Sequence, residues 1–132
     1  MNKQRLLILA ALFVGAALFP YGWLADQWPA FGAGFNAVFG SELGHLIGHS
    51  GIFFGAGLGL LWVAPTLRAR LPLFLALILG LGVAQEGIQL VYKGFAPGRA
   101  ELFDLCTDVA AGFLAWLLVR ALRSRCTGSA HP

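Results

Sequence analysis

Four long apolar runs dominate the sequence and constrain the fold more than any other feature. The runs cover residues 6–24, 44–63, 71–91 and 102–122. Each can cross the roughly 30 Å hydrocarbon layer of a membrane as a helix, which takes about 20 apolar residues. Only 11% of the residues are charged, so the chain cannot build a water-soluble surface. We therefore predict an all-α integral membrane bundle of about four transmembrane helices, forming a single domain over residues 1–132.

The segment between the first two runs carries an aromatic pattern. Trp28, Phe31, Phe35 and Phe39 recur at steps of three and four around Pro29, a residue suited to the first turn of a helix. This stripe predicts an interfacial helix that lies in the headgroup region. The alternative is a loop whose aromatic side chains pack on the bundle.

The ends of the first run allow two interpretations. A basic start followed by an apolar run resembles a signal peptide, with Ala25 at the cleavage edge. Tyr21 and Trp23 instead resemble the aromatic anchors that hold a membrane span at the interface. Further along, Gly40 and Ser41 are expected to end the aromatic segment and to cap the second span.

Basic residues lie at the ends of the apolar runs, which indicates topology signals and argues against a nucleic-acid partner. In a model with four spans, one side holds Lys3, Arg5, Arg68, Arg70, Arg120, Arg123 and Arg125, and the other side holds Lys93 and Arg99. The positive-inside rule then places both termini in the cytoplasm. Gly51, Gly55 and Gly59 repeat at every fourth position, which lets another helix approach closely, within the chain or in a homo-oligomer.

Polar and ionisable side chains inside the spans gather at one depth. Such groups are costly in a membrane, so we expect them to be paired, hydrated or functional. They come from three spans, and at 1.5 Å per residue they fall within about 10 Å of depth below the outer surface. These residues are His45, His49, Glu86, Gln89, Asp104 and Asp108, with Arg99 just above them in the outer loop.

This cluster allows several kinds of chemistry. Imidazole and carboxylate groups are ligands for divalent metals, and they also serve as general acids and bases. The plain structural alternative is that Arg99 pairs with Asp104, and Glu86 with a histidine, only to lock the helices together. We expect a proton-sensitive cluster with no tightly bound metal and no cofactor, because Arg99 would repel a cation.

The order of these residues resembles the VanZ-like family of bacterial membrane proteins, named for a teicoplanin-resistance protein. The resemblance covers roughly residues 45–116 and rests on His49 followed by Phe53 and Phe54, on Glu86-Gly-Ile-Gln89, on Gly98-Arg99, and on Asp104. This chain departs from the family where Asp-x-x-x-Asn closely followed by Gly is common, since it has Asp104, Asp108 and Gly112. It also lacks the Asp-Lys that often precedes the family histidine, with Glu42 and His45 nearby instead.

The resemblance implies a role in the bacterial cell envelope, in the cytoplasmic (inner) membrane, in contact with membrane lipids and a lipid-linked precursor. We expect an outward-facing pocket in which His49 or Glu86 acts as a base and Asp104 orients one of them. Arg99 would hold a phosphate or carboxylate, and the binding set would be completed by Gln89, Asp108 and His45. The rival interpretation is a membrane module without catalysis, in which the same residues only fix helix packing.

Overall fold

The computed structural model describes residues 3–94 and 98–128, and every regular element within them is helical. The elements are α1 (Lys3–Leu18), α2 (Tyr21–Gln27), α3 (Pro29–Phe39), α4 (Glu42–Val63), the 3-10 helix η1 (Pro65–Ala69), α5 (Leu71–Lys93) and α6 (Arg99–Gly128). The all-α prediction is therefore confirmed for this part of the chain.

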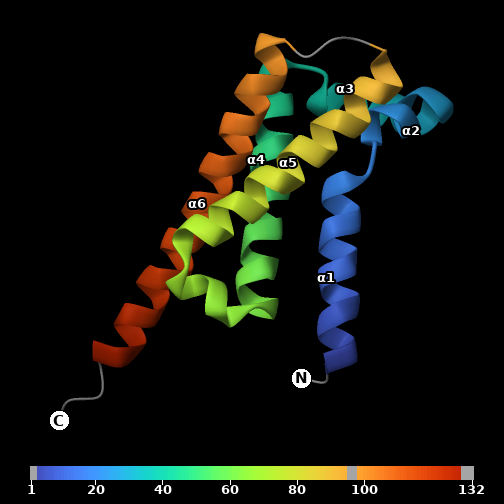
Figure 1. The fold of residues 1–132 in the computed structure, drawn as a ribbon. Coiled ribbons are helices and arrows are strands. Elements are labelled where there is room, and N and C mark those ends of the chain that lie inside the picture. The colour runs from blue at the N-terminus through green and yellow to red at the C-terminus, as the bar shows by residue number, and fades with distance from the viewer. Residues whose placement is uncertain (1–2, 95–97, 129–132) are drawn as a thin grey trace.

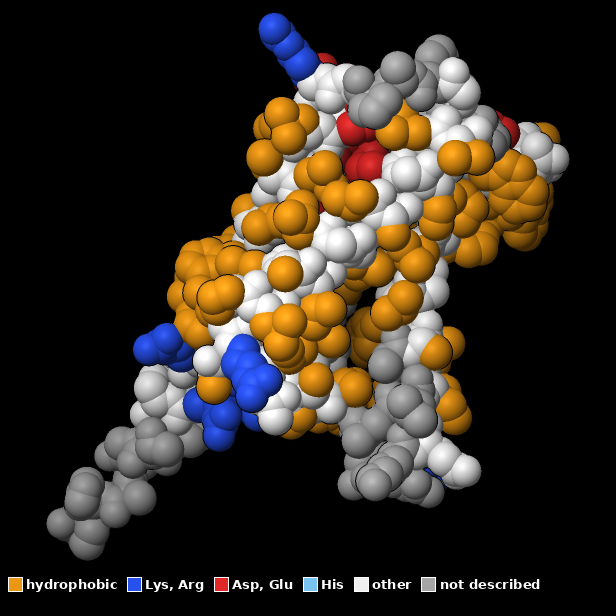
Figure 2. Space-filling view, viewed as in Figure 1, with side chains coloured by type: hydrophobic (Ala, Val, Ile, Leu, Met, Phe, Trp, Pro, Cys, Tyr) orange, Lys and Arg blue, Asp and Glu red, His pale blue; other side chains and the backbone are white. Residues whose placement is uncertain are grey.

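Three of these helices are long and apolar enough to cross a membrane. They are Glu42–Val63, Leu71–Val91 and Arg99–Ser124, close to the second, third and fourth apolar runs. Large hydrophobic side chains remain exposed on them, including Ile47, Val83, Leu102 and Leu114, and Figure 2 shows hydrophobic side chains spread over the middle of the molecule. Exposure on this scale is unfavourable in water and ordinary in lipid. The protein is therefore a multi-pass membrane protein.

The first apolar run does not form one continuous helix as expected. Helix α1 ends at Leu18, and a second helix, α2, begins at Tyr21. The break falls at Pro20, because proline has no N–H to continue the helix and disfavours helical backbone in the residue before it. Since α1 has only 16 residues, its length is about 24 Å at 1.5 Å per residue. A membrane span formed by the first apolar run, which would bring the total to four, thus remains a prediction.

The aromatic segment after Pro29 is the helix α3 and not a loop, and its position at the membrane interface stays a prediction. Its aromatic rings follow one another along one side, with centroids 5.6 Å apart for Phe31 and Phe35 and 5.1 Å apart for Phe35 and Phe39. The ring of Phe39 also packs against α4, where a Cβ added at Gly48 would lie 3.2 Å from it. This stripe therefore stacks on itself and meets the bundle at its last residue.

Local signals set the ends of the long helices. Ser41 caps α4 as expected, since its Oγ accepts a hydrogen bond from the backbone N–H of Gly44 at 3.0 Å. Helix α5 ends at Lys93 and is capped by Gly94, whose φ of 69° is left-handed and whose N–H bonds to the carbonyl of Leu90. These caps fix where α4 starts and where α5 stops, at the end of the molecule that holds the polar cluster.

Helices α4, α5 and α6 pack together, while α1 runs beside α4 and α5 (Figure 1). The start of α1, the helix η1 and the last turns of α6 lie at one end of the molecule. At the opposite end lie α2, α3 and the first turn of α6. The segments that we expected on one membrane face are thus at one end of the molecule, and the protein's orientation in the membrane is a separate prediction.

Glycine allows the closest helix contacts in this bundle. A Cβ added at Gly57 of α4 would lie 3.1 Å from Ala115 of α6, and one at Gly59 would overlap the ring of Phe13 in α1. Gly51 and Gly55 have nothing within 4 Å of the corresponding position. Among the described residues, the expected glycine stripe therefore works as a contact only at Gly59, and a homo-oligomer through this face stays a prediction.

Candidate functional site

Two histidine–aspartate pairs join α4 to α6. Nε2 of His45 lies 3.1 Å from Oδ2 of Asp104, and Nδ1 of His49 lies 2.9 Å from Oδ1 of Asp108. From the first pair to the second, the histidine and the aspartate each move four residues along the chain, which is about one helical turn. Helices α4 and α6 therefore run in the same direction here and are in contact over successive turns. The imidazole centroids are 4.6 Å apart. The two pairs thus form one continuous cluster between the helices.

The cluster changes from exposed to buried along its length. The side chain of His45 is 45% exposed, whereas that of His49 is 6% exposed and that of Asp108 is fully buried. Asp104 lies between these extremes, at 12%. A ligand could therefore reach the cluster at His45, and the deeper pair is shielded from solvent.

Helix α5 adds a second carboxylate to the buried pair. Oε1 of Glu86 lies 4.0 Å from Nε2 of His49, the ring nitrogen that is not bonded to Asp108. Helix α5 approaches α6 closely here because Gly82 has no side chain, and a Cβ at that position would lie 3.0 Å from Oδ2 of Asp108. The small residue thus allows three helices to meet at one imidazole.

Gln85 is a member of this region that the sequence reasoning missed. It is buried, and among the described residues its Oε1 has no hydrogen-bond partner. Gln89, which we expected in the binding set, is only half-buried, and no hydrogen bond involving it is found among the described residues. The signal was present in the sequence, because any amide inside an apolar span is costly and needs an explanation.

Arg99 occupies a different place from the one expected. It is the first residue of α6 rather than part of the loop, it is exposed, and the described residues give it no ion pair. The alternative in which Arg99 pairs with Asp104 is wrong, since Asp104 bonds to His45. The physical reason is the helical period: residues five positions apart do not share a face, whereas those three or four apart do.

The ligand atoms of the cluster are close enough together to consider a metal ion. One group consists of His45, His49 and Asp104, and a second of His49, Glu86 and Asp108, with the atoms of each group within 4.8 Å of one another. Both groups need His49, whose Nδ1 already bonds to Asp108. The second group can therefore offer one imidazole nitrogen and carboxylate oxygens, a smaller set than the sequence suggested.

The class of protein follows from these observations: a multi-pass helical membrane protein with a histidine–carboxylate cluster between three helices. Comparison with protein-family models, with curated proteins and with solved structures finds no match to this chain. The resemblance to the VanZ-like family therefore rests on the sequence motif alone and stays a prediction.

Proposed function

We propose that this chain is a VanZ-like membrane protein of the bacterial cell envelope, with both termini in the cytoplasm, whose cluster faces outward and binds a phosphate-bearing lipid-linked or surface substrate. One observation carries the proposal. The buried pair of His49 and Asp108 lies beside Glu86 and connects through His45 to the exposed end of the cluster. Helix packing alone does not need such a path from the surface to a buried base.

The buried imidazole is arranged for proton transfer. When the N–H at Nδ1 of His49 donates to Asp108, the neutral ring presents Nε2 as an acceptor toward Glu86. A single proton between these two groups can then sit on either one, and a substrate hydroxyl group could supply or receive it. Asp104 orients His45 instead of the buried ring, which changes the role that we expected for it.

Arg99 is the group best suited to hold a phosphate. Its guanidinium is exposed at the first residue of α6, at the same end as His45. Backbone N–H groups at a helix N-terminus attract anions, and a planar guanidinium can donate two parallel hydrogen bonds to a phosphate. Binding would therefore place the phosphate near Arg99 and the rest of the polar headgroup over His45.

A second candidate is a membrane module that only fixes helix packing. The observation in its favour is that both histidine–aspartate pairs connect the same two helices, α4 and α6. Removing one member of such a buried pair leaves an unpaired polar group and destabilises the fold whether or not a substrate binds.

Lipid binding measured together with unfolding temperature separates the two functions. The full chain in detergent is titrated with a polyprenyl phosphate and with the matching polyprenol, and bound lipid is read by native mass spectrometry. The variants are His49→Gln and Arg99→Lys, and the control is Glu42→Gln, which removes an exposed carboxylate from the same end of α4.

We expect both variants to bind the polyprenyl phosphate about tenfold more weakly than the wild type, which is a loss of ~1.4 kcal/mol in binding free energy. Arg99→Lys should keep the unfolding temperature, because Arg99 is exposed and the loss comes from bidentate geometry. The control should bind normally. If instead the variants unfold at lower temperature while the folded fraction binds as wild type, or if the polyprenol binds equally well, the packing function is the better account.

A further inference from the structure

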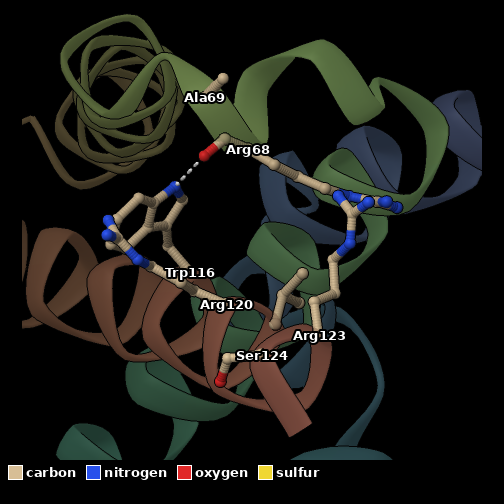
Figure 3. Close-up of a pocket in the computed structure, with 7 residues that line it drawn as sticks. Arg68, Ala69, Trp116, Arg120, Arg123 and Ser124 are labelled. Atoms are coloured by element: carbon tan, nitrogen blue, oxygen red, sulfur yellow. Dashed lines mark hydrogen bonds between the residues drawn. The ribbon is translucent and has the colours of Figure 1, made fainter. Parts of the chain in front are cut away.

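A second polar feature lies at the opposite end of the molecule from the histidine cluster. A cavity of about 410 Å³ opens between η1 and the last turns of α6, shown in Figure 3. Its lining consists of Arg68, Ala69, Trp116, Val119, Arg120, Arg123 and Ser124. The chain thus places three guanidinium groups around one opening, and nothing in the proposed function uses them.

The charge around this cavity is all of one sign. The chain has six Asp and Glu residues, all within the described part, and none of them lines the cavity. In Figure 3 the side chains of Arg68 and Arg123 extend toward each other. Like charges repel when they are brought together, most strongly where water is scarce. An anion between the guanidinium groups would turn that repulsion into attraction.

Contacts hold two of the arginines in place without cancelling their charge. Nε of Arg68 donates to the carbonyl of Leu61 at 2.9 Å, and the indole N–H of Trp116 donates to the carbonyl of Arg68 at 3.1 Å. The guanidinium of Arg120 lies over the Trp116 ring, 5.0 Å from its centroid. The partners are carbonyl groups and a ring, so the positive charges stay available to a ligand.

The surroundings of the cavity favour a lipid over a soluble anion. Trp116 and Val119 line it, and Leu118 and Leu122 of α6 are exposed next to these residues in sequence. A headgroup phosphate in the cavity could therefore leave its acyl chains along the apolar surface of α6. Basic pockets between transmembrane helices are typical binding sites for anionic headgroups in the cytoplasmic leaflet.

We propose that this cavity binds the phosphate of an anionic phospholipid headgroup, held by Arg68, Arg120 and Arg123. A planar guanidinium matches a phosphate with two parallel hydrogen bonds, which a site with three arginines can use from several directions. The inference does not depend on the proposed function, because it concerns other residues at the other end of the helices.

Binding of defined lipids to the purified full chain tests the proposal. Native mass spectrometry in detergent compares phosphatidylglycerol with phosphatidylcholine, and a thermal-shift arm adds inorganic phosphate alone. The test variant is Arg120→Gln with Arg123→Gln, two exposed positions on α6. The control is Arg5→Gln with Arg70→Gln, which removes the same charge at exposed positions that do not line the cavity.

We expect the test variant to bind phosphatidylglycerol about twenty-fold more weakly and the control variant to change binding by less than about twofold. Phosphatidylcholine should bind weakly to all three proteins. Equal losses in the test and control variants would mean that only diffuse surface charge attracts the lipid, and would overturn the site. The lipid assignment would be overturned if inorganic phosphate alone raises the unfolding temperature as much as phosphatidylglycerol does, and if phosphatidylglycerol binds no better than phosphatidylcholine.

Discussion

The two histidine–aspartate pairs have similar hydrogen-bond lengths and very different surroundings. His45 can exchange its partner for water, since nearly half of its side chain is exposed, whereas His49 and Asp108 have no such choice. A buried polar group that loses its partner keeps the cost of its desolvation. The deeper pair, His49 and Asp108, should therefore contribute more to the free energy of unfolding than His45 and Asp104.

Double-mutant cycles in detergent, with unfolding free energies as the readout, measure that difference. For His49→Ala and Asp108→Ala we expect a coupling energy above about 1 kcal/mol, near the upper range found between membrane helices. For His45→Ala and Asp104→Ala we expect about 0.5 kcal/mol or less, as for exposed pairs. Equal couplings in the two cycles would contradict the graded burial of the cluster.

Metal content is a second property decided at single residues. We expect no tightly bound metal, but Arg99 is exposed and not tied to the cluster, so its charge does not supply the expected repulsion. The reason is instead that Oδ2 of Asp104 and Oδ1 of Asp108 already bond to the imidazoles, so a cation would have to displace these hydrogen bonds. Elemental analysis of protein purified without chelator or added metal is the measurement. About one equivalent of zinc or manganese per chain, lost in His49→Ala, would defeat this expectation.

At the scale of whole helices, glycine positions decide how closely α4, α5 and α6 approach. A Cβ on Gly112 of α6 would lie 2.9 Å from Cγ2 of Ile78, a β-branched side chain with little freedom to move. Gly80 of α5 has nothing within 4 Å of its would-be Cβ. The same substitution should therefore have opposite effects at these two positions.

Gly112→Ala should destabilise the fold by about 1–3 kcal/mol, because overpacking forces the helices apart. Gly80→Ala should stabilise it by about 0.5–1 kcal/mol, since alanine is the better helix former where space is open. Unfolding in detergent measures both variants. A stabilising effect at Gly112 would show that α5 and α6 are less closely packed than described.

At the scale of the whole molecule, charge is distributed unevenly between the ends. Figure 2 shows Lys and Arg side chains grouped at the lower end, where η1 and the last turns of α6 lie. Acidic side chains lie toward the upper end, where a further basic side chain projects from the surface. The positive-inside rule predicts that the lower end faces the cytoplasm. The histidine cluster would then face outward, and the arginine-lined cavity inward.

Cysteine labelling tests this orientation. In a background with Cys106→Ser and Cys126→Ser, Ala100→Cys should react with an impermeant maleimide added to intact cells, and Thr66→Cys should react only after lysis. Both positions are exposed and lie at opposite ends of the bundle, in α6 and η1. The reverse labelling pattern would mean that the histidine cluster faces the cytoplasm and the arginine-lined cavity faces outward, which contradicts the proposed orientation.

The sequence by itself determined the three long helices and the depth of the polar cluster. Apolar runs bounded by caps and prolines form helices wherever lipid replaces water, because every backbone polar group must then be satisfied within the segment. The fixed rise of a helix also places His49, Glu86 and Asp108 at one level without knowledge of the packing. The break at Pro20 was equally readable, although we expected the first span to continue through it.

Only the tertiary structure decided which groups meet at that level. The helical period determines which residues share a face, but the rotation of each helix depends on contacts between residues far apart in the chain, such as Gly82 against Asp108. That rotation turned Asp104 toward His45 and buried Gln85. It also brought Arg68 to the same cavity as Arg123, because η1 packs against α6.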